Sequence, residues 1–169
     1  MSVQLGEWKD GELYIEGLKY SFPKKPKQSE IINNGLPKVR QIWNRIEEYK
    51  DYDWSDGWED RLEENPKQLK YLVDEVDRLH NGVWIYIYGE LVYLNNYMYF
   101  FCQWYLLEDG DYPKFRDSAL YYYRFIEICD KTLMCTGHTL LKARRLGATS
   151  MVLSALQLLL ITTMTSNFG

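Results

Sequence analysis

Residues 140–150 read Leu-Leu-Lys-Ala-Arg-Arg-Leu-Gly-Ala-Thr-Ser and join two apolar stretches of the chain. The stretch before the join, Thr139 to Leu141, favours a buried strand, and the run from Met151 to Ile161 favours a helix packed on more than one side. The turn between them contains three cations, a glycine and two hydroxyls, in this order: Lys142, Arg144, Arg145, Gly147, Thr149 and Ser150. The sequence therefore predicts a strand, a basic loop and a helix in succession.

This turn has the chemistry of an anion-binding site. A helix start leaves backbone N–H groups unpaired and presents the positive end of the helix dipole, which together form a phosphate cradle. In the pattern G-x-x-x-x-G-K-[ST], Gly147 matches the second glycine and Thr149 the metal-binding hydroxyl. Lys142 replaces the first glycine and Ala148 replaces the lysine. The positive charge has thus moved to the head of the loop, from where a long side chain still reaches a phosphate.

The stretch from Lys142 to Thr149 resembles the deviant Walker A loop of large terminase subunits, the ATP-driven DNA-packaging motors of tailed phages. Some members of that family have the loop lysine at its start and an arginine two residues before the glycine, as Lys142 and Arg145 are placed here. The segments 82–100 and 109–125 are similar to the lead-in of large terminases from phages of Bacteroides-type hosts. The resemblance extends over roughly the second half of the chain.

The resemblance implies ATP and Mg²⁺ as cofactors and a set of site residues. The phosphate-binding loop would comprise nine consecutive residues: Lys142, Ala143, Arg144, Arg145, Leu146, Gly147, Ala148, Thr149 and Ser150. Lys142 would neutralise β- and γ-phosphate oxygens, Arg145 would act on the γ-phosphate, and Thr149 would hold Mg²⁺, because phosphoryl transfer depends mostly on positioning and charge neutralisation. Tyr112 and Arg116, just upstream, are the candidates for holding the adenine.

The intact protein would use ATP hydrolysis to package double-stranded DNA in the host cytoplasm, together with the portal and the small terminase subunit. After Gly147 the sequence contains no Asp or Glu. The acidic strand that completes a P-loop Mg²⁺ site, and the nuclease region of the family, are therefore expected outside this chain. We expect the 169 residues alone to be the amino-terminal part of the motor and to hydrolyse ATP negligibly.

Two simpler interpretations stay open. A basic loop before an apolar helix can be a helix start with solvated arginines, although cations at that end oppose the helix dipole. The whole chain can also be a non-enzymatic phage interaction module, in which the aromatic, acidic first half docks a partner and the basic loop binds an anion incidentally. The continuation of the reading frame would discriminate between these functions, because only a motor needs a following strand that ends in acidic residues.

Composition indicates a globular protein, with 46% hydrophobic and 26% charged residues. The formal net charge of −4 argues against strong DNA binding by the chain as a whole. The 15 tyrosines and 6 tryptophans favour core and sheet packing over base stacking, since they are mostly not interleaved with basic residues. No stretch reaches the ~20 apolar residues of a membrane span, and the first residues lack the features of a signal peptide.

Metal-binding patterns are weak. The three cysteines, Cys102, Cys129 and Cys135, suit a reducing cytosol, and Cys135 with His138 lacks a second ligand pair at zinc-site spacing. The acidic residues of 108–111 precede a proline and favour a solvated loop. We expect no metal centre apart from the Mg²⁺ site that the resemblance implies.

The fold class predicted from these patterns is an α+β amino-terminal region, 1–107, that leads into the first strand, P-loop and helix of an incomplete α/β P-loop NTPase domain, 108–169. Hairpin turns are expected at Asp10–Gly11 and Gly89–Glu90, and a linker over 19–28. A first helix begins at Pro37, and a third is capped by Asp117 or Ser118. A second runs from near Pro66 to Asn81–Gly82, with these residues on its inner face: Leu69, Leu72, Val73, Val76 and Leu79.

Overall fold

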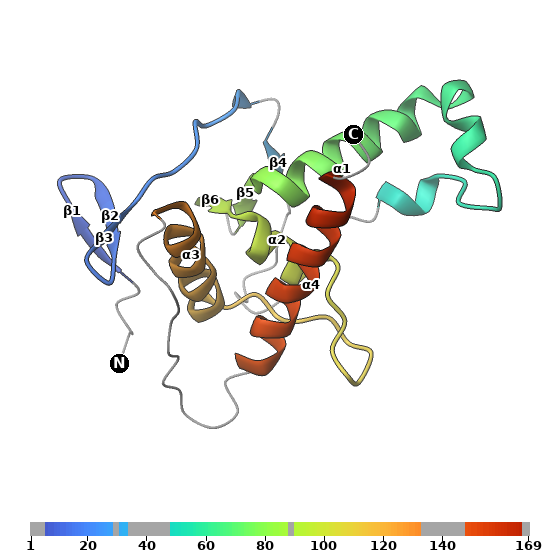
Figure 1. Cartoon of the computed structure of the whole chain (residues 1–169). Helices are drawn as coiled ribbons and strands as arrows, with labels where there is room; N and C mark the ends of the chain where they lie inside the picture. The colour runs from blue at the N-terminus through green and yellow to red at the C-terminus, as the bar shows by residue number, and fades with distance from the viewer. Residues whose placement is uncertain (1–5, 29–30, 34–47, 88–89, 133–147, 167–169) are drawn as a thin grey trace.

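The computed structural model describes residues 6–28, 31–33, 48–87, 90–132 and 148–166 of the chain. Within these ranges it has two small three-stranded sheets and four α-helices, so the mixed α+β class is confirmed. Figure 1 shows the first sheet at one side of the molecule and the helices gathered around the second sheet. The predicted helix at Pro37 lies outside the described residues.

The first sheet is an antiparallel meander of β1 (Glu7–Lys9), β2 (Glu12–Ile15) and β3 (Leu18–Tyr20). The turn at Asp10–Gly11 has positive φ at both positions, 50° and 80°, which is the backbone that tight hairpins need. The first predicted hairpin is therefore confirmed. Two of the three residues of β3, Lys19 and Tyr20, fall in the predicted linker, because three residues are too few for alternation to be a clear signal beside the lysines and prolines that follow.

The second sheet pairs β4 (Ile32–Asn33) in parallel with β5 (Val83–Ile87), and β5 antiparallel with β6 (Glu90–Leu94). The antiparallel pairing of β5 with β6 confirms the second predicted hairpin. Both strands are rich in the aromatic and β-branched residues that favour sheets. Strand β4 was not predicted, because two residues are too few for a periodic signal.

Helix α1 (Pro66–Asn81) begins and ends where the sequence predicted. The Asn65 side chain caps it by accepting a hydrogen bond from the Gln68 N–H, and Gly82 ends it with a positive φ of 72°. The predicted inner face is confirmed only in part. Leu72 and Leu79 are half-buried, and Leu79 packs against the main core, whereas Leu69 is 42% exposed and Val73 and Val76 are also exposed.

The buried side of α1 is the more polar one. Its buried residues are Gln68, Tyr71 and Glu75. Gln68 donates through Nε2 to the Asp53 carbonyl at 2.7 Å, and Glu75 accepts from donors on and just after the next helix. Because the polar groups of Gln68 and Glu75 find partners, they are buried at little cost, and Leu69, Val73 and Val76 face outward.

Helix α2 (Asn96–Gln103) is the centre of the main core, since every residue from Tyr97 to Gln103 is buried. Asn95 caps α2 through a hydrogen bond from the Met98 N–H to Oδ1, 3.1 Å. The sequence left helix and strand open here, and the structure has a helix. The main core takes residues from both sides of position 107, from Ile85 to Leu158.

Helix α3 (Asp117–Thr132) starts at the predicted cap. Ile128 and Cys129 of its predicted inner face are buried, whereas Tyr121 and Phe125 are half-buried against a second, smaller core beside the first sheet. Glu127 is buried between these cores and accepts hydrogen bonds from the Tyr20 hydroxyl at 2.5 Å and from Asn95 Nδ2 at 3.0 Å. This buried carboxylate connects the first sheet to the helices.

Helix α4 (Ala148–Ser166) is longer than the predicted 151–161 and lies across α1 and α2 (Figure 1). The expectation that it packs on more than one side is wrong for the described part of the chain. One face is buried, namely Ala148, Met151, Ser154, Ala155 and Leu158. The other face exposes six apolar side chains, Val152, Leu153, Leu156, Leu159, Leu160 and Ile161. None of the described helices is both long and apolar enough to cross a membrane.

Candidate functional site

Most of the predicted phosphate loop, Lys142 to Gly147, lies outside the described residues, as does the predicted strand before it. The last three loop residues, Ala148, Thr149 and Ser150, form the first turn of α4. The hydroxyls therefore stand where the helix begins, as the sequence predicted. Ala148 is buried, Ser150 is half-buried and Thr149 is exposed, so the Thr149 hydroxyl is open to a ligand at the positive end of the helix.

A small cavity of about 110 Å³ adjoins the first turn of α4. Arg116 and Lys114 line it from the segment before α3, and Ser150 lines it from α4. Two predicted site residues that are distant in sequence, Arg116 and Ser150, are thus brought to one place. With two cations and a helix start, the cavity favours an anionic group.

The size of this cavity limits what it can hold. Ligand pockets for whole cofactors usually measure about 300–1,000 Å³, so a space of about 110 Å³ suits one part of a nucleotide, such as a phosphate or the edge of a base. Its other lining residues are mostly apolar: Phe101, Leu107, Pro113, Ser118, Ala119 and Met151. A larger ligand would have to extend beyond this cavity along the start of α4.

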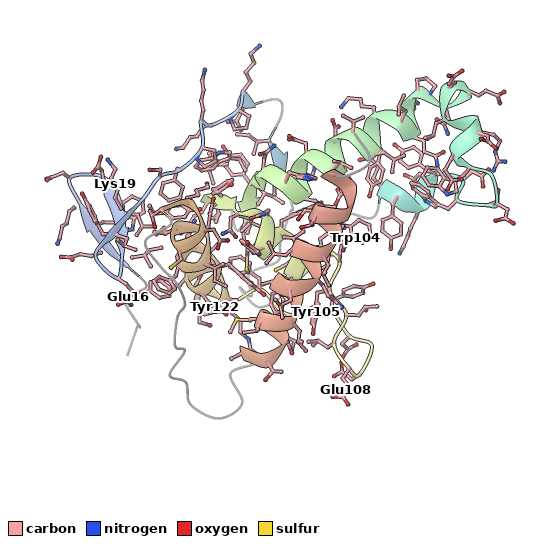
Figure 2. The ribbon with its side chains drawn as sticks, in the orientation of Figure 1. Glu16, Lys19, Trp104, Tyr105, Glu108 and Tyr122 are labelled. Atoms are coloured by element: carbon pink, nitrogen blue, oxygen red, sulfur yellow. The ribbon has the colours of Figure 1, made fainter. Side chains whose placement is uncertain are left out.

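Tyr112, the other predicted adenine contact, does not line this cavity. It is exposed on the loop between α2 and α3. Figure 2 shows Glu108, on the same loop, projecting away from the body of the protein, and 108–112 are all exposed. The acidic part of this loop is therefore solvated, as the sequence indicated, and the structure brings Arg116 but not Tyr112 to the helix start.

A groove of about 600 Å³ runs along α1 and β5, with no residue of the predicted loop among those that line it. Its charges are mixed, because Lys24, Lys70 and Arg78 line it together with Asp74 and Asp77, and Lys70 pairs with Asp74 at 2.5 Å. These opposite charges partly compensate each other, so the groove has no strong preference for a ligand of one charge.

The sequence interpretation missed a third cavity, of about 310 Å³, between α1 and the segment that precedes it. The buried Glu75 carboxylate forms part of its wall beside aromatic rings. Two signals pointed here: the density of aromatic and acidic residues in 49–60, and the polar residues of α1 at Gln68, Tyr71 and Glu75, which share a helix face.

The described cysteines have no catalytic setting. Cys102 and Cys129 are buried, and burial raises the pKa of the Cys102 thiol far above its usual range, so this thiol stays protonated and unreactive. Cys135 and His138 lie outside the described residues. Within the parts of the chain that the structure describes, no group of three His, Cys, Asp or Glu side chains could hold a metal ion.

Comparison with known proteins gives no relative. No protein-family model matches this chain, no curated protein is significantly similar to it in sequence, and no solved structure is significantly similar to it in fold.

Proposed function

We propose that this chain is the amino-terminal part of a terminase large subunit, and that the amino end of α4 binds the triphosphate of ATP with Mg²⁺. The observation that supports the proposal best is the start of α4 at Ala148, which puts Thr149 in the first turn of a helix directly after a basic stretch of sequence. In a P-loop the metal-binding hydroxyl has this position.

The surroundings of the helix start are consistent with this role. Arg116 lines the same cavity as Ser150, so a cation from the segment before α3 is available to an anion bound at α4. The exposed Thr149 hydroxyl is free of the packing that buries Ala148. The proposed roles remain those implied by the resemblance: Lys142 and Arg145 act on the phosphates, and Thr149 acts on the metal.

The exposed face of α4 also agrees with the proposal. A helix that follows a phosphate loop usually packs against the central sheet of an α/β domain, which covers its apolar side chains. The six exposed apolar side chains of α4 would then be covered by strands of the ATPase domain that follow in the intact motor. The ATP-driven packaging of double-stranded DNA belongs to that intact protein.

Binding of a fluorescent ATP analogue to the 169-residue protein, with and without Mg²⁺, tests the proposal. We expect Lys142→Ala and Thr149→Ala to weaken binding about 10-fold or more, because each removes a contact to a charged group. Thr163→Ala is the matched control, since it removes a hydroxyl from the far end of the same helix, and its affinity should equal that of the unaltered protein.

Two results would contradict the proposal: the absence of Mg²⁺-ATP binding, or equal affinity of the Lys142→Ala, Thr149→Ala and Thr163→Ala variants. Steady turnover is a separate readout. We expect none from this chain, because the carboxylates that would complete the metal site are not in its sequence after Gly147.

The second candidate function is a non-enzymatic interaction module. One observation favours it, namely the acidic, aromatic cavity beside α1, which none of the predicted nucleotide-binding residues lines. The two functions are compatible in one protein, since their residues are separate.

A further inference from the structure

The cavity beside α1 is walled mostly by aromatic rings. It lies where α1 meets the segment that starts with the short helix η2 (Glu48–Asp51), and Figure 1 shows this segment alongside α1. Six residues line its volume of about 310 Å³: Tyr49, Trp54, Tyr71, Leu72, Glu75 and Trp104. Two ring pairs stand around it, Tyr49 with Trp104 (labelled in Figure 2) at 5.5 Å between centroids and Trp54 with Tyr71 at 6.4 Å.

A buried carboxylate forms part of the wall. Glu75 is only 6% exposed, and it accepts hydrogen bonds from the Tyr99 hydroxyl at 2.8 Å and from Trp104 Nε1 at 2.5 Å. It also pairs with Arg78 at 2.9 Å, which offsets part of its charge. These donors hold the carboxylate in place, and its bond to Trp104 Nε1 fixes that ring at the cavity.

Tyr71 contributes a polar atom that lacks a partner. The residue is 4% exposed, and its hydroxyl makes no hydrogen bond to any residue that the structure describes. Burial, with a smaller contribution from the charge of Glu75, raises the pKa of Tyr71, so the phenol stays neutral. The hydroxyl oxygen is enclosed by protein, so Tyr71 meets a ligand in the cavity with its ring and not with its polar atom.

The surroundings of the cavity are acidic. Residues 48–64 contain eight acidic and only two basic side chains, and most of this segment is exposed. Such a field attracts cations and repels phosphates, so it disfavours a nucleotide or nucleic acid as the occupant of these rings. The charge of the rim therefore selects a basic ligand.

We propose that this cavity binds the ammonium group of a lysine side chain from a basic segment of a partner protein. Aromatic faces attract an ammonium group through the ring quadrupole. The ammonium group would lie over the ring faces, and the methylene stem would lie along Leu72 and the rings. This inference does not depend on the nucleotide site, because the two use different residues.

The test measures the tryptophan fluorescence of the full chain during titration with a short peptide of alternating lysine and glycine. A peptide with norleucine in place of lysine is the ligand control, because it keeps the apolar stem and loses the charge. We expect saturable binding of the lysine peptide only, weakened by salt. Equal binding of the norleucine peptide, or no binding of the lysine peptide, would overturn the proposal.

Three variants locate the site. Trp54→Ala should weaken binding about tenfold or more, and Trp8→Ala, which removes an exposed tryptophan from β1, should leave it unchanged. Tyr71→Phe removes only a hydroxyl that is enclosed by protein, so the fold and the ring face are retained and lysine binding should be unchanged. Unchanged affinity of Trp54→Ala, or equal losses in Trp54→Ala and Trp8→Ala, would refute the site.

Choline chloride serves as a free organic cation in a competition arm. Choline has a single charge and no peptide chain, so it gains less than the peptide from the acidic surroundings, and we expect it to compete poorly with the lysine peptide. Displacement of the peptide at equal concentrations of choline would indicate a small-molecule site and would overturn the assignment to a partner protein.

Discussion

Replacement of Gly82 by alanine should destabilise the protein more than any surface substitution. Gly82 ends α1 and precedes β5, with a φ of 72° and a ψ of −168°. A Cβ built at this position would lie 2.4 Å from the Leu94 carbonyl oxygen, 2.8 Å from the Asn95 Cα and 2.8 Å from the Tyr93 hydroxyl. Two of these atoms belong to the backbone where β6 turns into α2, so they cannot move away without disturbing the cap of that helix.

The magnitude has two parts. A non-glycine residue held in this region of backbone space costs about 1–3 kcal/mol. Forcing an extra carbon into packed surroundings costs about 1–3 kcal/mol more. We therefore expect Gly82→Ala to lower the free energy of unfolding by about 2–6 kcal/mol, a large part of the roughly 5–15 kcal/mol that stabilises a typical domain.

Gly110 provides a matched control. Its φ of 83° is similar, but a Cβ there would meet no atom within 4 Å, so Gly110→Ala should show the backbone cost alone. Urea unfolding followed by tryptophan fluorescence measures both variants. Equal free energies of unfolding for the two alanine variants would refute the steric argument, because the close contacts would then contribute nothing.

Three further predictions concern buried groups. Glu127→Ala leaves the Tyr20 hydroxyl without its acceptor and removes one acceptor from Asn95. It should lower the free energy of unfolding in urea by about 2–4 kcal/mol, against about 1 kcal/mol for Glu127→Gln. Equal losses in the two variants would contradict this. Burial raises the pKa of Tyr20 and of Tyr99, so the contribution of these two groups to stability should be constant below about pH 10 and should fall above it, as urea midpoints measured from pH 8 upward will reveal. Cys102 should resist thiol reagents in the native protein and react after unfolding, which peptide mapping by mass spectrometry will check; native labelling would contradict its burial.

The parts of the fold that the sequence predicted correctly are those set by local backbone chemistry. Asp10–Gly11 requires positive φ at a hairpin, and Gly82 requires it at the end of α1, so both boundaries were readable. The inner face of α1 was not readable from the sequence in the same way. Its orientation depends on Tyr99 and Trp104, which supply donors to Glu75 from a distant part of the sequence, and residue type alone does not reveal such partners.

The candidate site, too, was predictable from the sequence only where local signals determine it. The helix start at Thr149 and Ser150 was predicted from the loop, because a glycine followed by hydroxyls is a local signal. Arg116 reaches the start of α4 only through the packing of the segment before α3, while Tyr112 in the same loop points to solvent. The aromatic cavity draws its walls from three separate segments, so the spacing of residues within one segment indicates a part of the site but not the whole.

The complete burial of α2 bears on how the protein can be divided. Its side chains contact partners that come both earlier and later in the chain, from β5 to α4. A cut in the exposed loop after Leu107 would leave each half with an uncovered apolar surface. The two halves should therefore be insoluble when expressed separately, and should recover a native structure when they are produced together in one cell.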